Sequence, residues 1–176
     1  MTRFSMLLAT AAALAGATPA FAAPVSAVPQ AEGHVLILSP LSFVRLTDLD
    51  FGTVVSSSIA GAVTINANTG ARTTTPGVTP MPLAPGSRGY FAGAGSGGQQ
   101  VIVTLTPPAV LTNTVTPANT IPVVWMALDN GDVTATKTIH ATNLTFFVGV
   151  GGTILVGANQ PDGDYASTFE ITADYQ

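Results

Sequence analysis

Short apolar runs separated by turn residues repeat along the chain from residue 35 onward. Val, Ile, Thr and Phe recur in runs of about four to eight residues bounded by Gly, Pro, Asn and Asp, the pattern of β-strands. Helical periodicity is absent after residue 22. The pattern predicts strands at residues 35–38, 42–46, 50–55, 62–67, 90–93, 100–106, 122–128, 136–142, 144–148, 153–156 and 167–175. This density predicts an all-β fold: a single immunoglobulin-like β-sandwich of antiparallel strands over residues 34–176.

The clearest alternation lies near the end of the sequence, in residues 167–175. Phe169, Ile171, Ala173 and Tyr175 fall on one face of a period-two pattern, and polar residues fall on the other. This is what a half-buried strand requires. We expect the strand to complete the core and to offer its backbone to a partner, so assembly is a hypothesis from the outset.

The first 22 residues have the pattern of a secretory signal peptide. Arg3 precedes an apolar run, and small residues at Ala20 and Ala22 form the predicted cleavage site. A membrane-spanning helix needs about 20 consecutive apolar residues, whereas Pro19 and Pro24 end this run early. We therefore expect export, to the periplasm, the exterior or the cell surface, with no transmembrane segment after the leader is removed. Residues 23–33 should form a mobile N-terminal extension.

Composition narrows the classes of function. The chain has nine Asp and Glu against five Lys and Arg, and its net charge of −4 argues against nucleic-acid binding. Only 8% of its residues are charged, which favours a protein that buries surface against other subunits. It has no cysteine, so a disulfide framework, thiol catalysis and cysteine-ligated metals are excluded.

Several short motifs follow one another in an order that resembles a known family. They are Leu49-Asp50-Phe51-Gly52, Phe147-Val148-Gly149, Gly152-Thr153-Ile154-Leu155-Val156 and Gly163-Asp164-Tyr165. The order is similar to that of small secreted Gram-negative surface proteins catalogued as domain of unknown function 4402, which are thought to be pilin-like or spore-coat-U-like. Gly163, the alternating strand and Tyr175 also resemble the last strand of chaperone–usher pilins. Classical pilins carry a disulfide, and this chain departs from them in having no cysteine.

The resemblance implies a fimbria-like or cell-surface assembly whose subunits associate by β-strand addition. Its partners would be further copies or related subunits, and a periplasmic chaperone. Residues 23–33 would then be a donor arm, although a tail without a role fits their composition equally well. Residues 34–41 are either the donor or the first strand of the domain. The alternative function is a stand-alone adhesin or ligand-binding module that uses residues 68–89, a Thr-, Pro- and Gly-rich stretch predicted to be a long loop.

No motif predicts an enzyme, a cofactor or a metal site. Residues 93–98 contain G-x-G-x-x-G, and Ser96 resembles a nucleophile elbow, but both motifs need a following helix, so a hairpin connection explains the glycines. His34 and His140 are predicted to be strand residues. The acidic turns at 129–132 and 162–164 have hairpin chemistry rather than calcium-loop spacing. Trp125 is either a core residue or, if exposed, a platform for carbohydrate.

Overall fold

The computed structural model describes residues 23–176, so Ala20 and Ala22 of the predicted leader lie outside the described residues. Ile37–Gln176 form one compact unit, and residues 23–36 contain no strand. Within the described residues the regular structure is strand only, and the strand pairs are antiparallel. The predicted all-β fold is confirmed. None of the described residues belongs to a helix long and apolar enough to span a bilayer.

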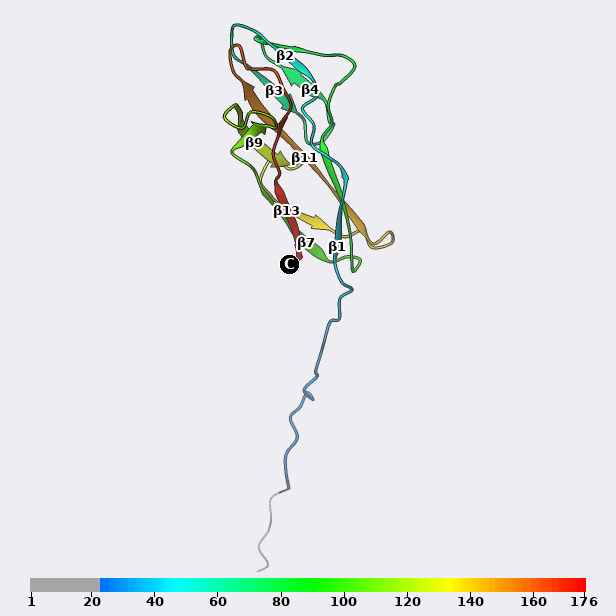
Figure 1. The fold of residues 1–176 in the computed structure, drawn as a ribbon. Helices are drawn as coiled ribbons and strands as arrows, with labels where there is room; N and C mark the ends of the chain where they lie inside the picture. Colours follow the sequence, from blue (N-terminus) through cyan, green and yellow to red (C-terminus); the bar gives the residue numbers. More distant parts are fainter. Residues whose placement is uncertain (1–22) are drawn as a thin grey trace, which may run out of the picture. The chain divides into compact units, whose positions relative to one another are not determined.

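The strands form one large sheet and two small ones (Figure 1). The large sheet has the order β1-β6-β11-β9-β8-β12, with β3 and β4 joined beside β11. Its strands are β1 (Ser42–Thr47), β3 (Gly61–Ile65), β4 (Arg72–Thr74), β6 (Gly89–Ala94), β8 (Val110–Asn113), β9 (Thr120–Leu128), β11 (Thr145–Val156) and β12 (Tyr165–Ala166). The second sheet has the order β10-β7-β13, and its strands are β7 (Gln100–Thr106), β10 (Thr134–Thr138) and β13 (Glu170–Tyr175). The third sheet pairs β2 (Val54–Ser56) with β5 (Val78–Pro80).

The long strand β11 links the two ends of the domain (Figure 1). Its first half pairs with β6, its second half pairs with β3, and β9 pairs with its middle. Phe146, Val148 and Val150 are buried in one apolar cluster with Val103 of β7. Further along β11, Ile154 and Val156 are buried in a second cluster. The sandwich therefore has two cores in series along β11. The first core is the cluster that contains Phe146, Val148 and Val150, and the second core is the cluster that contains Ile154 and Val156.

The second cluster lies between the large sheet and the β2–β5 pair. It contains Phe51, Val63, Ile65, Val78, Ile121, Ile154 and Val156. In β3 the burial alternates strictly, because one face of a strand meets the core and the other meets solvent.

The predicted alternation of the closing strand is also confirmed: Phe169, Ile171, Ala173 and Tyr175 are half-buried, and their neighbours are exposed.

Some predictions about strands and loops are wrong. Residues 68–89 are not one loop, since they contain β4 and β5, which pair with β3 and β2. Residues 35–38 form no strand. The two strands predicted at 144–148 and 153–156 are the single strand β11, whose glycines do not interrupt the ladder because backbone pairing needs no side chain. Residues 95–99 connect the two main sheets rather than closing a hairpin.

The two histidine predictions also need correction, and the structure decides between the two alternatives for Trp125. His34 and His140 both lie outside strands, and His140 Nδ1 instead accepts the N–H groups of Thr142 and Asn143 in a turn. Trp125 is 45% exposed and is not a core residue. β9 is irregular at this point, because its register with β11 shifts between Thr153 and Ile154, and this brings the indole to the outer face.

Two isoleucines allow a matched test of the second core. Ile65 is fully buried, whereas Ile59 is 57% exposed. We expect Ile65→Ala to lower the free energy of unfolding by about 2 to 5 kcal/mol, because it removes buried methylenes and leaves a cavity. Ile59→Ala should change the same quantity by less than about 0.5 kcal/mol. Urea denaturation of both variants measures the difference, and equal effects would contradict this assignment of the core.

Candidate functional site: an open seam between two strand edges

Two segments from opposite ends of the domain sequence lie side by side without pairing. Residues 39–57 carry β1 and β2, and residues 159–176 carry β12 and β13. Asn159 N–H donates to Ser57 O at one end, and Tyr175 Oη donates to Ser39 O at the other, so the segments run antiparallel. Between these ends no hydrogen bond joins residues 40–55 to residues 161–174 in the described chain. We call this gap the open seam.

The open seam has unpaired strand edges on both sides. Within the described residues β1 pairs only with β6, and β13 pairs only with β7. β2 likewise pairs only with β5, and β12 pairs only with β8. An edge strand leaves alternate N–H and C=O groups without a strand partner, and it is a template for a further strand.

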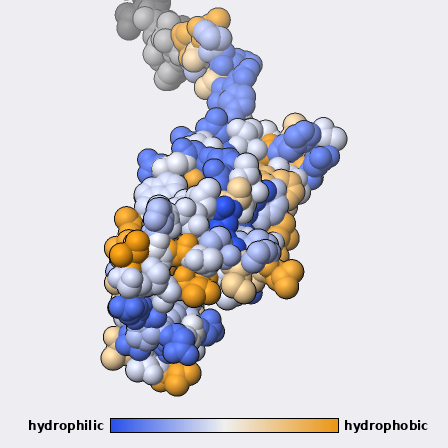
Figure 2. All heavy atoms as spheres, turned by 90° about the horizontal axis from the view of Figure 1, so that it is seen from above, coloured by the Kyte–Doolittle hydropathy of each residue, from blue (hydrophilic) through white to orange (hydrophobic). Residues whose placement is uncertain are grey.

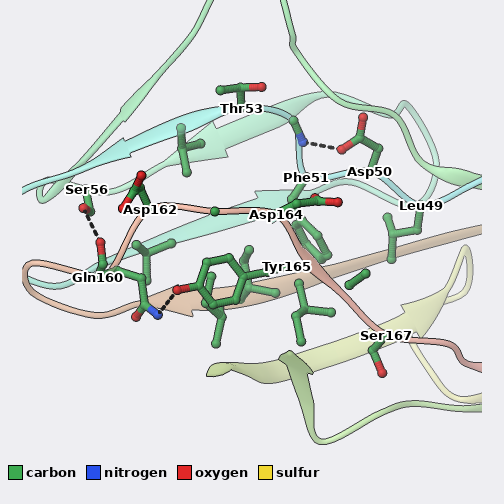
Figure 3. Close-up of a pocket in the computed structure, with 18 of the residues that line it drawn as sticks. Leu49, Asp50, Phe51, Thr53, Ser56, Gln160, Asp162, Asp164, Tyr165 and Ser167 are labelled. Carbon is green, nitrogen blue, oxygen red and sulfur yellow. Dashed lines mark hydrogen bonds between the residues drawn. The ribbon is translucent and has the colours of Figure 1, made fainter. Parts of the chain in front are cut away.

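A cavity of about 610 Å³ lies at the β2–β12 end of the open seam (Figure 3). Its floor comes from the second core and includes Ile121, Ile154 and Val156. Figure 3 shows Asp50, Phe51 and Thr53 on one wall and the segment that carries Asp162, Asp164 and Tyr165 on the other. The family-like motifs at 49–52 and 163–165 are therefore brought together, although more than 100 residues separate them in sequence.

Gly52 shapes the wall that carries Asp50, Phe51 and Thr53, which we call the first wall. Its φ is +74°, a conformation that favours glycine, and a Cβ there would collide with the Ala84 carbonyl and the Arg72 guanidinium. Asp50 supports the same turn, because its Oδ1 accepts the Gly52 N–H at 2.7 Å. The backbone of Asp50 also forms two reciprocal 2.8 Å bonds with Ser87. The turn lets β2 pair with β5 and leaves its other edge in the open seam.

Arg72 joins the first wall to the loop between β5 and β6 by hydrogen bonds. Its Nη1 donates to the carbonyl oxygens of Phe51, Thr53 and Ala84 at 3.3, 3.2 and 2.8 Å. Its Nη2 donates to the carbonyl oxygen of Met81 at 2.9 Å. One guanidinium thus donates to four carbonyls outside the strands, which suits its planar set of five donors. Nothing in the Thr-rich sequence around Arg72 signals this role.

The opposite wall, which carries Asp162 and Asp164, is called the second wall. It is held by Asn113, a buried polar residue that is 3% exposed. Its Oδ1 accepts the N–H groups of Val115 and Thr116 at 3.0 and 2.8 Å, and its Nδ2 donates to Asp162 O at 3.4 Å. Gly163 lies against this amide with a φ of +138°, and a Cβ would overlap Asn113 Nδ2. The glycine of the Gly163-Asp164-Tyr165 motif is therefore needed for close packing.

Tyr165 closes the far end of the cavity. Its Oη donates to Pro161 O at 2.8 Å and accepts from Gln160 Nε2 at 3.0 Å. Ser56 Oγ donates to Gln160 O at 3.1 Å, which ties β2 to the second wall beyond the cavity (Figure 3). The open seam therefore ends at this set of bonds.

A smaller cavity of about 150 Å³ lies further along the open seam, between β1 and β13. Arg45, Phe91, Phe169 and Ile171 are among its lining residues. The Phe169 ring meets Phe91 edge-on at 6.2 Å, and the rings of Phe91 and Phe43 stack at 5.7 Å. This part of the core is covered only partly, since Phe43, Phe169 and Ile171 are half-buried.

Three residues close the other end of the open seam, and we call them the latch: Ser39, which takes part through its backbone, Ser96 and Tyr175. Ser39 N–H donates to Ser96 Oγ at 2.7 Å. Tyr175 Oη accepts the Ser96 N–H at 2.8 Å and donates to Ser39 O at 2.8 Å. The Tyr175 hydroxyl is thus used within the chain, and its ring packs against the first core. Ser96 has a structural contact and lies in a turn, not ahead of a helix.

Charge is distributed unevenly along the open seam. Asp50, Asp162 and Asp164 line the large cavity, and no lysine, arginine or histidine of the described chain lines it. Arg45 lines the small cavity and pairs with Asp48 at 2.6 Å. In the described part of the chain no set of three or more His, Cys, Asp or Glu residues is arranged to hold a metal. The open seam has the chemistry of an apolar groove with an acidic end.

The remaining predicted site residues lie elsewhere. Val148, Gly149, Gly152 and Leu155 are all on β11, where Val148 is fully buried and Leu155 is 42% exposed on the outer face. None of them lines either cavity. Phe169 lines both cavities and Ile171 lines the small one, so the predicted assembly strand does form one wall of the open seam. The sequence reasoning missed Arg72 and Asn113.

Two arginines allow a matched test of the first wall. Arg72→Met should lower the free energy of unfolding by about 1.5 to 3 kcal/mol, the range for hydrogen bonds to charged groups, because four carbonyls lose a charged donor. Those of Thr53, Met81 and Ala84 each keep one backbone N–H. Arg45→Met removes only an exposed pair with Asp48 and should cost less than about 1 kcal/mol. Thermal and denaturant unfolding measure both, and an Arg72 variant as stable as the Arg45 variant would contradict the role of Arg72.

Comparison with known proteins gives a family but no characterised relative. No curated protein and no solved structure matches the chain significantly. A family model does match, over residues 41–175, and it covers β1 to β13 with both walls of the open seam. The chain therefore belongs to the family described as domain of unknown function DUF4402.

Proposed function

We propose that this chain is an exported, non-catalytic structural subunit of a fimbria-like or cell-surface assembly, in which a strand from a neighbouring subunit enters the open seam. The observation that carries the proposal is the pair of unpaired edges, β1 and β13, on either side of half-buried apolar side chains. An added strand would pair with both edges and cover these side chains at once. Such addition is the mode of association that the resemblance to pilins implies.

Burial of apolar surface and hydrogen bonding at the strand edges both favour an added strand in the open seam. Phe43, Phe169 and Ile171 belong to the first core but keep part of their surface in solvent. Covering apolar surface contributes roughly 25 cal/mol per Å². The added strand also satisfies edge N–H and C=O groups, which fixes its direction and register. A closed sandwich would already have gained both contributions by pairing β1 with β13.

The outer surface supports the same proposal. Large apolar side chains such as Val44, Leu46 and Phe147 are about half exposed. Figure 2 shows apolar side chains in separate patches among polar ones on the face that it displays. Such a weakly charged surface suits a protein that packs against other subunits. The alternative of a binding module loses part of its basis, because residues 68–89 are not one long loop but contain β4 and β5.

Export is part of the proposal and has its own test. We expect processing after Ala22, because small residues at Ala20 and Ala22 follow an apolar run. Intact-mass measurement of the protein recovered from the cell surface should give a chain that begins at Ala23. Recovery of a chain that still begins at Met1 would remove the basis for an exported subunit.

Hydrogen exchange tests strand addition directly. On assembly, amides of β1 and β13 that face the open seam should exchange at least about tenfold more slowly, because they gain partners and exchange only on opening. The amides of β4, which pairs only with β3 and lies outside the open seam, should be unchanged and serve as the control.

Size-exclusion chromatography and electron microscopy must accompany that measurement, using protein recovered from the native surface. Polymers in which the β1 and β13 amides stay as fast as in the monomer would show association by another surface. A protein that stays monomeric at the native surface would contradict the proposed function altogether.

A further inference from the structure

We infer that the outer face of the large sheet binds a neutral polysaccharide through one row of residues, which we call the platform: Trp125, Thr153, Thr64 and Thr73. These residues come from β9, β11, β3 and β4, in that order across the sheet (Figure 1). None of them lines either cavity. The platform is therefore a second site, separate from the open seam and independent of the strand addition proposed above.

The pairing register sets the side chains of the platform in line. Thr153 is opposite Trp125 on one side and opposite Thr64 on the other. Thr64 is in turn opposite Thr73. Residues opposite each other in neighbouring strands lie on the same face of a sheet. With about 4.8 Å between strands, the platform is about 14 Å long, which suits an oligosaccharide rather than a single sugar ring.

The platform lies on the solvent side of the sheet. In β3, Val63 and Ile65 are buried in the second core, so Thr64 between them lies on the opposite face. In β11, Ile154 is buried in the same core, so Thr153 also lies on the outer face. The β4 threonine of the platform is exposed, and the indole of the platform is 45% exposed.

A β-bulge presents the indole. Trp125 pairs with Thr153. The next pair along β9 joins Val123 to Ile154, so Val124 is an extra residue in this strand. Val124 and Trp125 are consecutive and are 62% and 45% exposed, whereas a regular strand would turn one of them inward. Bulges often re-aim a side chain beside a functional site, and this one keeps a large aromatic ring on the surface.

The platform has unused hydrogen-bonding capacity. Within the described chain the indole Nε1–H and the Thr73 hydroxyl take part in no side-chain hydrogen bond, and the Thr64 and Thr153 hydroxyls bond only to each other, at 2.8 Å. A threonine hydroxyl has one donor and two acceptor positions, and the indole N–H is a donor. The row can therefore both donate to and accept from a ligand that is rich in hydroxyl groups.

This combination matches the two sides of a sugar. A sugar ring has a face of C–H groups, which packs on an aromatic ring, and a rim of hydroxyls, which pair with other hydroxyls. The indole of Trp125 supplies an apolar plane with a polar N–H at its edge. Val124 and Leu155, which are 62% and 42% exposed, extend the apolar surface beside the platform.

Charge selects a neutral ligand. The platform residues carry no charge, and neither do Val124 and Leu155 beside them. Arg72 adjoins the platform on β4, but it is opposite the buried Ile65 and so lies on the inner face. The chain as a whole has a net charge of −4. Without a cation in the row, a net negative protein repels an acidic polysaccharide.

A protein partner fits the platform less well. The residues that dominate binding between proteins are enriched in Trp, Tyr and Arg, and threonine is under-represented among them. The platform joins one tryptophan to a row of threonines and has no arginine on its face. A contact between subunits is therefore the alternative that the experiment has to separate from sugar binding.

A glycan array tests the class of ligand. The chain, produced from its full sequence and labelled with a fluorophore, is applied to an array of neutral and acidic oligosaccharides. We expect binding to neutral oligosaccharides. Trp125→Ala should weaken this binding at least about tenfold, as expected when a central aromatic contact is lost. Phe147→Ala removes another aromatic side chain of β11 that is 47% exposed, and as the matched control it should bind like the unmodified chain.

Intrinsic fluorescence locates the site, because Trp125 is the only tryptophan of the chain. The neutral oligosaccharide that binds most tightly on the array is titrated into unlabelled protein, and it should shield the indole from quenching by acrylamide. Thr73→Val should weaken the affinity about two- to tenfold, the range for one neutral hydrogen bond, without changing the unfolding midpoint. Thr136→Val, exposed on β10 in the second sheet, is its control and should leave the affinity unchanged.

Other results would overturn the inference. They are an array on which no neutral oligosaccharide binds, or a Trp125→Ala variant that binds as tightly as the unmodified chain. If Trp125→Ala does not fold, Thr73→Val decides the case, and unchanged affinity would refute the platform. An indole that becomes shielded when the chain polymerises without sugar would assign this face to a contact between subunits. The proposed function, which depends on β1 and β13, would stand in each case.

Discussion

The pairing of β11 with three neighbours is the interaction on which the domain depends. β6, β3 and β9 all bond to this one strand, and its inward side chains enter both apolar clusters. Loss of order in β11 would therefore separate the two cores as well as the large sheet. Because β6 and β3 occupy successive halves of β11, the domain is longer than a sandwich built on one set of pairs.

The open seam is a consequence of how the sheets end. β1 closes the large sheet and β13 closes the second sheet, and the two edges face each other without bonding. Separate contacts hold the two walls of the large cavity: Arg72 and Gly52 hold one, and Asn113 and Gly163 hold the other. In the part of the chain that the structure describes, no hydrogen bond joins these walls between the two closed ends. In the proposed assembly, a gap that is already open in the single chain lowers the cost of binding a strand.

The sequence predicts those parts of the fold that depend on local periodicity. β7 has the predicted bounds of residues 100–106, because it alternates buried and exposed residues throughout. β4 and β5 were missed because their Thr- and Pro-rich sequences have no such alternation, and distant partners stabilise them. The motifs at 49–52 and 163–165 were visible separately. Their meeting across a cavity depends on tertiary packing through Arg72 and Asn113, which no local pattern reports.

The pairing of β13 with β7 also sets an order of events during folding. Residue 170 pairs with residue 106, so this ladder joins segments more than 60 residues apart. Until residues 170–175 arrive, one edge of β7 and the apolar side chains beside it stay open to solvent. Long-range pairing of this kind is slow and leaves intermediates prone to aggregation. The closing strand therefore removes an edge prone to aggregation at the same moment as it completes the core.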